Sequence, residues 1–217
     1  MNWDLFPDEP AVEAGAATIA PGAILLRGFA RESGPALLAS VAAVTRQSPF
    51  RFMTTPGGYR MSVAMTNCGA AGWVTDRTGY RYEPLDPLTG EPWPPMPELF
   101  RSLATEAASE AGFEGFVPDG CLINRYEPGT RLSLHQDRNE RDFREPIVSV
   151  SLGLPVTFQF GGAERSDKPI RLLLRHGDIV IWGGPARLAH HGVLALKDGQ
   201  HPATGPLRFN LTFRKAL

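Results

Sequence analysis

Residues 124–137, with the sequence NRYEPGTRLSLHQD, decide the fold that this chain can adopt. They predict a strand, a Pro-Gly turn and a second strand that ends in His135 and Asp137. Side chains two apart on a strand project from the same face at a spacing of roughly 6–7 Å, so these two can point at one atom. An imidazole and a carboxylate in this arrangement supply two ligands of a 2-His-1-carboxylate triad, which is typical of non-haem Fe(II) sites.

A third ligand would have to come from a neighbouring strand, and two adjacent histidines are available. His190 and His191 open a predicted strand, and successive side chains on a strand point to opposite faces, so only one of them can face a site inside the fold. His176, in a His-Gly-Asp turn, and His201, in a Pro-flanked loop, are weaker candidates. A His-x-Asp pair with a distant histidine is a common coincidence, so the triad needs support from elsewhere in the chain.

The C-terminal strand, residues 208–214, gives this support. Arg208, Asn210, Thr212 and Arg214 share one of its faces, while phenylalanine and leucine side chains share the other. Two guanidinium groups on one face are costly to bury unless anions pair with them, and a dicarboxylate would pair with both through bidentate hydrogen bonds. The alternative is an edge strand whose two arginines face solvent.

Length and composition fit one globular domain. The chain has 217 residues and a net charge of −1, and 42% of its residues are hydrophobic and 21% charged, which is ordinary for such a protein. Its apolar runs are too short to span a bilayer, and its acidic N-terminus lacks the basic and apolar regions of a signal peptide. Cys68 and Cys121 have no CxxC spacing, so we expect reduced structural thiols and a cytoplasmic protein that does not bind membranes.

The periodicity predicts an α+β fold that is mainly β with flanking helices. Residues 1–22 are expected to be a poorly structured lead-in, residues 23–29 a short strand, and residues 34–47 and 97–111 amphipathic helices. From residue 121 on the period is two, and turn signals separate eight predicted strands: 121–126, 131–136, 146–152, 155–160, 170–174, 178–182, 190–195 and 207–214. Eight short antiparallel strands that follow an N-terminal helical region are typical of a double-stranded β-helix, the cupin-like jelly roll.

Residues 49–97 differ from the rest, because glycines and prolines alternate there with aromatic and basic residues. Short strands joined by tight turns are expected, for example 59–66 and 79–83. Such a segment suits a binding lid, and the alternative is that its aromatic side chains form a satellite core. We therefore divide the single domain (1–217) into an N-terminal helical extension (about 1–48), a lid (about 49–97) and a jelly-roll core (about 116–217).

Eight blocks of sequence, spread from about residue 20 to the end of the chain, resemble the bacterial AlkB family of DNA-dealkylation proteins within the Fe(II)/2-oxoglutarate dioxygenase superfamily. The blocks are SPFR (48–51), TPGGY (55–59), MSVAMTNCG (61–69), CLINRY (121–126), LSLHQD (132–137), SVSLGLP (149–155), FQFGG (158–162) and NLTFR (210–214). Runs of this length in the family's order are far more specific than a three-residue triad.

The resemblance implies the cofactors and the residues that hold them. Fe(II) is the implied metal, 2-oxoglutarate and O2 are the implied co-substrates, and the implied iron ligands are His135, Asp137 and His191. The residues that match 2-oxoglutarate-binding positions are Asn124, Tyr126, Arg208, Asn210 and Arg214. Among these, Arg208 is expected to pair with the distal carboxylate, and Arg214 to lie near the keto-acid end.

Further positions match contacts to a nucleic acid. The resemblance puts Trp73 and Tyr80 at the base pocket, with His135 stacked on the flipped base, and it puts around the nucleotide Thr55, Tyr59, Met61, Met65, Ser133 and Arg165. Asn139 is a departure, because bacterial members carry an acidic residue two positions after the metal aspartate. Asparagine keeps a hydrogen-bond acceptor at this position but lacks the negative charge, so the substrate preference stays open.

The implied function is DNA repair by oxidative demethylation. The methyl group of lesions such as 1-methyladenine or 3-methylcytosine would leave as formaldehyde, while 2-oxoglutarate and O2 become succinate and CO2. The expected partner is alkylated DNA, preferably single-stranded or with a flipped-out base, and the expected state is a monomer. Two alternatives are the same chemistry on RNA or protein, and a non-catalytic jelly roll that binds lesions.

Overall fold

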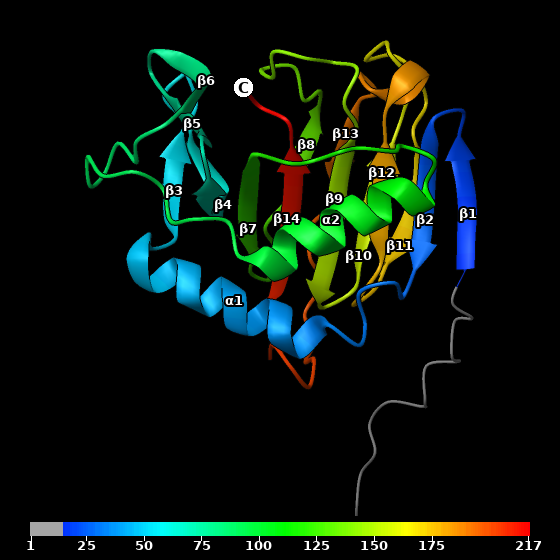
Figure 1. The fold of residues 1–217 in the computed structure, drawn as a ribbon, viewed down its shortest axis with the longest axis horizontal. Helices are drawn as coiled ribbons and strands as arrows, with labels where there is room; N and C mark the ends of the chain where they lie inside the picture. The colour runs from blue at the N-terminus through cyan, green and yellow to red at the C-terminus, as the bar shows by residue number, and fades with distance from the viewer. Residues whose placement is uncertain (1–14) are drawn as a thin grey trace, which may run out of the picture.

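Strands of alternating polarity build the larger of two facing β-sheets in the computed structural model, which describes residues 15–217. This sheet is antiparallel throughout, and its eight strands follow the order β1-β2-β12-β9-β14-β7-β4-β3 (Figure 1). In that order the strands are β1 (Gly15–Ala20), β2 (Ala23–Arg27), β12 (Ile179–Trp182), β9 (Ile147–Gly153), β14 (Arg208–Arg214), β7 (Gly120–Tyr126), β4 (Arg60–Gly69) and β3 (Arg51–Thr54).

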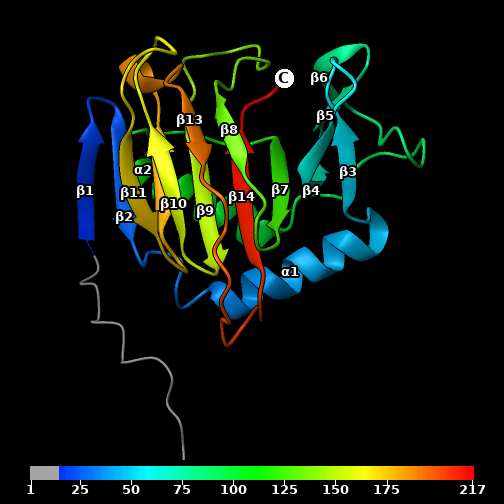
Figure 2. The ribbon, with the colours of Figure 1, turned by 180° about the vertical axis from the view of Figure 1, so that it is seen from behind.

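The smaller sheet lies against one face of the larger sheet and completes the jelly roll (Figure 2). Its four strands, in spatial order, are β11 (Ile170–Leu174), β10 (Val156–Phe160), β13 (His191–Val193) and β8 (Leu132–His135). Two further elements belong to neither of these sheets. They are a hairpin of β5 (Gly72–Asp76) and β6 (Gly79–Glu83), and the short 3-10 helix η1 (Gly184–Ala186).

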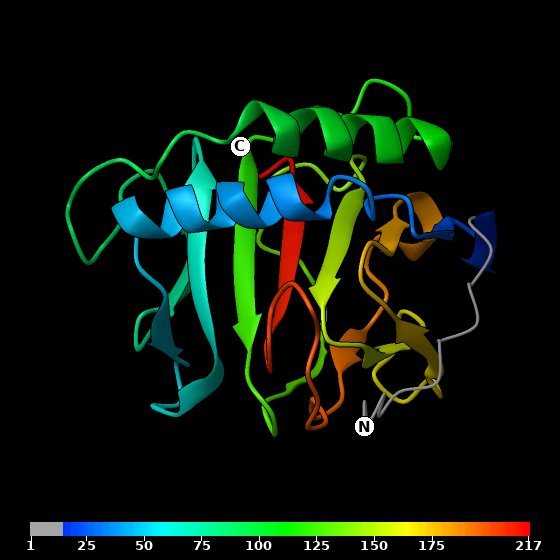
Figure 3. The same ribbon diagram turned by 90° about the horizontal axis from the view of Figure 1, so that it is seen from below.

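Two helices, α1 (Gly34–Gln47) and α2 (Glu98–Glu110), cover the other face of the larger sheet (Figure 3). In α1, Leu37, Val41 and Val44 recur at helical spacing and are buried against the sheet. Ser33 occupies the N-cap position of α1, but its side chain makes no capping hydrogen bond. None of the helices in residues 15–217 is long and apolar enough to cross a membrane.

The larger sheet separates two hydrophobic cores. One lies between the sheet and the helices, and the other between the two sheets. Strand β14 contributes to both sides. Its apolar residues Leu211 and Phe213 belong to the helix-side core, and Arg208 and Arg214 point into the space between the sheets. The alternation predicted for this strand is therefore confirmed, and its arginines do not face solvent, since both are buried.

Both predicted helices are present, and all eight predicted strands of the core are present to within two residues at each end. The expected poorly structured lead-in is wrong for Gly15–Ala20, which form β1 and pair with β2, for example Ala16 with Leu26. This strand is mostly exposed and consists largely of small residues, so backbone pairing keeps it on the sheet. Its sequence has no hydrophobic alternation from which a strand could be predicted. The rest of that lead-in, residues 1–14, lies outside the described residues. The expected helical extension thus contributes two strands as well as α1.

Candidate metal and co-substrate site

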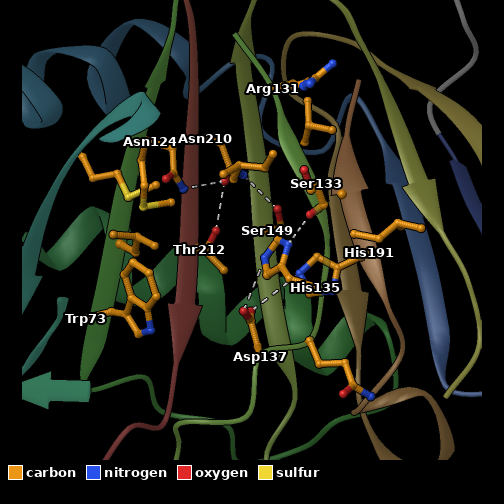
Figure 4. Close-up of a pocket in the computed structure, with 18 of the residues that line it drawn as sticks. Trp73, Asn124, Arg131, Ser133, His135, Asp137, Ser149, His191, Asn210 and Thr212 are labelled. Carbon is orange, nitrogen blue, oxygen red and sulfur yellow. Dashed lines mark hydrogen bonds and ion pairs between the residues drawn. The ribbon is translucent and has the colours of Figure 1, made fainter. Parts of the chain in front are cut away.

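A cavity of about 1110 Å³ opens between the two sheets, beside the hairpin of β5 and β6. Figure 4 shows that side chains from both sheets point into it. Every residue for which the sequence predicted a role lines this cavity, so the structure brings together side chains that are far apart in the chain. Their individual roles stay predictions.

Three potential metal ligands converge at one end of the cavity (Figure 4). His135 ends β8, Asp137 follows two residues later, and His191 opens β13 directly opposite His135. One ligand atom from each side chain lies within 4.8 Å of the others. His135 Nε2 is 3.7 Å from Asp137 Oδ1, and His191 Nε2 is 3.8 Å from Asp137 Oδ2. This is the arrangement that a facial triad requires.

Backbone carbonyls orient both imidazole rings. Nδ1 of His135 lies 2.8 Å from the carbonyl oxygen of Ser133, and Nδ1 of His191 lies 3.1 Å from that of Ala189. A carbonyl only accepts, so Nδ1 carries the proton in each ring and Nε2 presents its lone pair to the centre of the triad. The residue after His191 is Gly192, and β13 passes so close to β8 there that a larger residue would not fit. A Cβ at this position would lie 2.8 Å from the carbonyl oxygen of Leu132.

The charge states of the triad suit a metal ion. Burial by itself raises the pKa of Asp137, but the nearby Arg214 guanidinium and the two histidines outweigh it and hold this pKa below its usual range. Burial, and then the neighbouring His135, lower the pKa of His191 to about 3. At neutral pH the site therefore offers a carboxylate and a neutral imidazole, the forms that bind metals.

Arg214 fixes the orientation of the aspartate. Its Nε and Nη2 atoms donate to the same oxygen, Asp137 Oδ2, at 3.0 and 2.6 Å. Both side chains are almost fully buried, so the pair is desolvated and its geometry is well defined. Oδ1 of Asp137 makes no such contact with Arg214, and it faces His135.

A buried ion pair that the sequence did not reveal holds the loop behind Asp137. Arg187 donates to Glu140 Oε2 at 3.0 Å and to the backbone carbonyl of Asp137 at 2.8 Å. Tyr82, on hairpin strand β6, donates to Glu140 Oε1 at 2.6 Å, and Arg214 lies 3.4 Å from the same oxygen. The pair has no sequence signal, because its members are 47 residues apart and neither belongs to a periodic pattern.

The opposite end of the site contains a guanidinium group that lacks an anion. Arg208 is 1% exposed, and its Nη2 donates to Ser151 Oγ at 3.0 Å. Nε and Nη1 are buried without a partner, and the guanidinium carbon lies 4.8 Å from the ring centre of Tyr126. Burial lowers the pKa of Arg208, since no carboxylate in the described chain offsets the loss of water. A carboxylate group would fit these two unpaired donors.

An amide network lines the cavity on β14, between Arg208 and Arg214 in the strand. Figure 4 shows its members Asn124, Ser149, Asn210 and Thr212. Asn210 donates to Ser149 Oγ at 2.8 Å and accepts from Asn124 Nδ2 at 3.1 Å and from Thr212 Oγ1 at 3.0 Å. The described residues therefore satisfy the amide of Asn210 on both sides, which makes it a rigid support on the cavity wall.

Aromatic side chains of the hairpin form one rim of the cavity. Trp73 and Tyr80 stack with ring centres 5.7 Å apart and planes inclined by 21°. The indole Nε1 of Trp73 donates to Asn139 Oδ1 at 3.1 Å, so the hairpin is tied to the loop that follows Asp137. Tyr80 is 47% exposed, and the rim therefore presents an open aromatic surface and not only a satellite core.

A jelly roll that carries a His-x-Asp pair, a distant histidine and a buried arginine defines an oxygenase that uses iron and a 2-oxo acid. The sequence model of the 2OG-Fe(II) oxygenase superfamily matches residues 22–214. The chain is 59% identical to the alpha-ketoglutarate-dependent dioxygenase AlkB of Salmonella typhimurium, over 98% of this chain and 97% of that protein. It is 58% identical to the Escherichia coli protein of the same name, again over 98% and 97% of the two chains.

The fold agrees with these relatives. The solved structure of OsALKBH1 superposes with a TM-score of 0.80 at 28% identity, covering 93% of this chain and all of that one. The chain therefore belongs to the 2OG-Fe(II) oxygenase superfamily and, within it, to the AlkB dioxygenases. Its cofactor is Fe(II), and its co-substrates are 2-oxoglutarate and O2.

Proposed function

We propose that this protein repairs DNA by oxidative removal of methyl groups from base nitrogens, as in 1-methyladenine and 3-methylcytosine. The observation that carries the proposal is one cavity that contains a metal triad at one end, an unpaired buried arginine at the other end and a rim of aromatic side chains. Support also comes from the AlkB dioxygenases and from the human protein named nucleic acid dioxygenase ALKBH1, which is 33% identical over 56% of this chain. That match spans 31% of the human protein.

In this proposal His135, Asp137 and His191 hold the iron, and Arg208 binds the distal carboxylate of 2-oxoglutarate. The bound iron and 2-oxoglutarate supply the oxidising chemistry, in which one oxygen atom of O2 goes to succinate and the other to the methyl carbon. Arg214 has a positioning role, because its two hydrogen bonds to Oδ2 fix the orientation of the Asp137 carboxylate. Asn124, Tyr126 and Asn210 form the remaining wall against the co-substrate.

Trp73 and Tyr80 would receive the alkylated base, which must leave its stack to reach the metal. This requirement favours single strands or flipped-out bases, so we propose single-stranded DNA as the preferred substrate. The side chains that we assign to the neighbouring nucleotide are Thr55, Tyr59, Met61, Met65, Ser133 and Arg165, all of which line the cavity. We further propose a cytoplasmic monomer in which residues 49–97 act as the nucleotide-recognition lid of the jelly-roll core, residues 116–217.

The decisive experiment replaces one metal ligand and follows formaldehyde. Asp137→Ala should lower formaldehyde release from a 3-methylcytosine oligonucleotide by at least about a hundredfold, since loss of even an outer-shell partner of a metal site costs about 10–100-fold. Methylated DNA, RNA and mononucleotides are assayed side by side by mass shift, with and without 2-oxoglutarate. Full activity of Asp137→Ala would disprove the triad. Turnover of RNA alone would replace DNA as the substrate, and lesion binding without any turnover would favour a binding module.

Asn139 provides a test of lesion preference. It lies at the rim and accepts a hydrogen bond from Trp73, a bond that a carboxylate can also accept. Asn139→Asp should raise kcat/KM for cationic lesions such as 1-methyladenine about fivefold, the effect of roughly 1 kcal/mol between unit charges in a water-like medium. The neutral lesion 1-methylguanine should gain nothing. An equal change for both lesions would show that position 139 does not contact the base.

A further inference from the structure

The edge of the larger sheet next to the cavity mouth carries an exposed stack of an aromatic ring and an arginine. Phe52 lies on β3, the outermost strand at that edge, and 38% of its side chain is exposed. The guanidinium carbon of Arg60, the first residue of β4, lies 4.0 Å from the centre of the Phe52 ring. This is the shortest of the arginine-aromatic contacts in residues 15–217.

Arg60 differs from most of the other stacked arginines because its charge is not paired with a carboxylate of the described chain. Three of the five arginines that stack on aromatic rings in the described chain also pair with a carboxylate; they are Arg51, Arg125 and Arg187. The two that pair with none are Arg208, which faces the co-substrate site, and Arg60. A stacked guanidinium keeps its in-plane N–H groups free, so Arg60 can still bind an anion such as a phosphate.

One member of the stack, Arg60, belongs to the cavity mouth, and Phe52 lies just outside it. Arg60 lines the cavity, as do Thr55 and Tyr59 in the turn that joins β3 to β4, and Tyr59 is 78% exposed. A chain that leaves the cavity over this turn passes Tyr59 and Arg60, and Phe52 lies against Arg60 at the edge of the sheet. Alternating aromatic rings and cations along such a path are what single-stranded nucleic acids bind, because rings stack on bases and arginines pair with phosphates.

We propose that the strand flanking the alkylated base runs over this sheet edge, where one flanking base extends the Phe52–Arg60 stack and Arg60 pairs with its phosphate. The inference rests on the proposed function, because it takes the occupant of the cavity to be a nucleotide. It adds a subsite outside the cavity, beyond the nucleotides directly next to the alkylated base, so a trinucleotide is too short to reach it and a longer strand is not.

The test compares a short and a long substrate. Fluorescence anisotropy measures the binding of a methylated trinucleotide and of longer methylated strands, which are extended on the 5′ or the 3′ side. The measurements are made with Fe(II) and 2-oxoglutarate but without O2, so that no turnover occurs. Phe52→Ala should weaken binding of the strand extended on one side about tenfold, which is the scale of one lost base-ring stack. Binding of the trinucleotide should not change. Arg60→Ala should do the same and should also flatten the salt dependence of long-strand binding, since one phosphate contact is lost.

Phe29→Ala and Arg171→Ala are the matched controls. Phe29 has the same exposed fraction as Phe52, 38%, but it lies beyond β2, and Arg171 is exposed on β11; neither lines the cavity. Both should bind long strands like the unchanged protein. Melting temperatures check that each variant is folded.

Unchanged long-strand affinity in both Phe52→Ala and Arg60→Ala would overturn the inference, and the proposed function would stand if the trinucleotide is still demethylated. If the unchanged protein demethylates no nucleotide of any length, the proposed function itself fails. Sedimentation gives one further outcome. A dimer that Phe52→Ala converts to monomers would make this edge an interface between copies of the chain, which also overturns the inference.

Discussion

At Arg208 the protein buries a guanidinium group with two unpaired nitrogen atoms, Nε and Nη1. Desolvation of a charge without a counter-ion costs free energy, so this residue destabilises the fold when no anion is bound. The same desolvation makes a carboxylate bind more strongly, because there is little competing water around the pair.

Arg208→Leu therefore has opposite effects on stability and on binding. The free energy of unfolding of the ligand-free protein should stay the same or rise, while the KM for 2-oxoglutarate should increase about 10–150-fold, the equivalent of 1.5–3 kcal/mol for hydrogen bonds to a charged group. Urea unfolding and steady-state kinetics measure the two quantities. A lower stability together with an unchanged KM would show that Arg208 is a structural residue and not the co-substrate anchor.

Single residues of the site differ in how well the sequence predicts them. The His-x-Asp spacing predicts that His135 and Asp137 converge, although β8 ends at His135 and Asp137 lies just beyond it, and the alternation of β14 predicts that Arg208 and Arg214 share a face. The choice between His190 and His191 cannot be made from the residues alone, because either can face inward, and the family resemblance was needed to make it. In the structure it is His191 that joins the other two potential ligands.

The element that couples the hairpin to the triad is the loop from Asp137 to Glu145. Arg187, one residue beyond η1, bonds to the backbone at both ends of this loop, to the carbonyl oxygens of Asp137 and Glu145, and to the Glu140 side chain. Tyr82 approaches Glu140 from the hairpin. A change in the position of the hairpin therefore reaches the metal carboxylate through only a few buried contacts.

Arg187→Met should lower the free energy of unfolding by about 3–5 kcal/mol, because removing one partner of a buried pair leaves an uncompensated charge. It should also weaken Fe(II) binding, since the backbone of Asp137 loses its support. Arg144→Met is the matched control in the same loop. The Arg144 side chain is 90% exposed and pairs with Asp142, so its loss should leave both quantities nearly unchanged. Equal effects of the two variants in denaturant unfolding and metal titration would contradict this role for the buried pair.

The strands themselves are well predicted, but their pairing is not. A period of two identifies each strand of the core, whereas the order β9-β14-β7 depends on contacts between segments far apart in the chain. Strand β1 was missed because its residues are small and mostly exposed, so it has no apolar periodicity to detect. Strand β3 lies in residues 49–97, where short strands were expected, but its position was not specified, since only four residues separate Pro49 and Phe50 from the next turn.

On the scale of the whole molecule, a histidine at the end remote from the metal site ties the core to helix α1. His176 Nδ1 accepts a hydrogen bond from the backbone N–H of Gly153 at 3.0 Å, and its ring stacks on His201 with centres 4.7 Å apart. A Cβ on Gly34, at the start of α1, would lie 2.4 Å from His176 Nε2, so only glycine allows this approach. Burial, and then His201 and Arg31, lower the pKa of His176.

This depressed pKa predicts how stability depends on pH. The unfolded chain binds a proton at His176 near the ordinary pKa of about 6.5, and the folded protein binds it only at lower pH, so the contribution is present above about pH 6.5 and is lost as the pH falls below that value. His176→Asn keeps an acceptor for Gly153 but does not titrate. Between about pH 7 and about pH 5 its free energy of unfolding should therefore fall less steeply than that of the unchanged protein. Parallel curves from urea unfolding at several pH values would contradict this assignment.

The two hydrophobic cores have a consequence for the sulfur atoms of the protein. Cys68 and Cys121 are paired in register on β4 and β7, in the core beneath the helices, and the larger sheet separates them from the cavity. Met61 and Met65 line the cavity itself. In an enzyme that consumes O2, any oxidant that escapes productive reaction therefore reaches the methionines before it reaches the cysteines. Methionine sulfoxide can be reduced back by cellular reductases, whereas overoxidised cysteine in general cannot. The fold thus separates the two thiols, whose overoxidation is irreversible, from the site where oxidants arise.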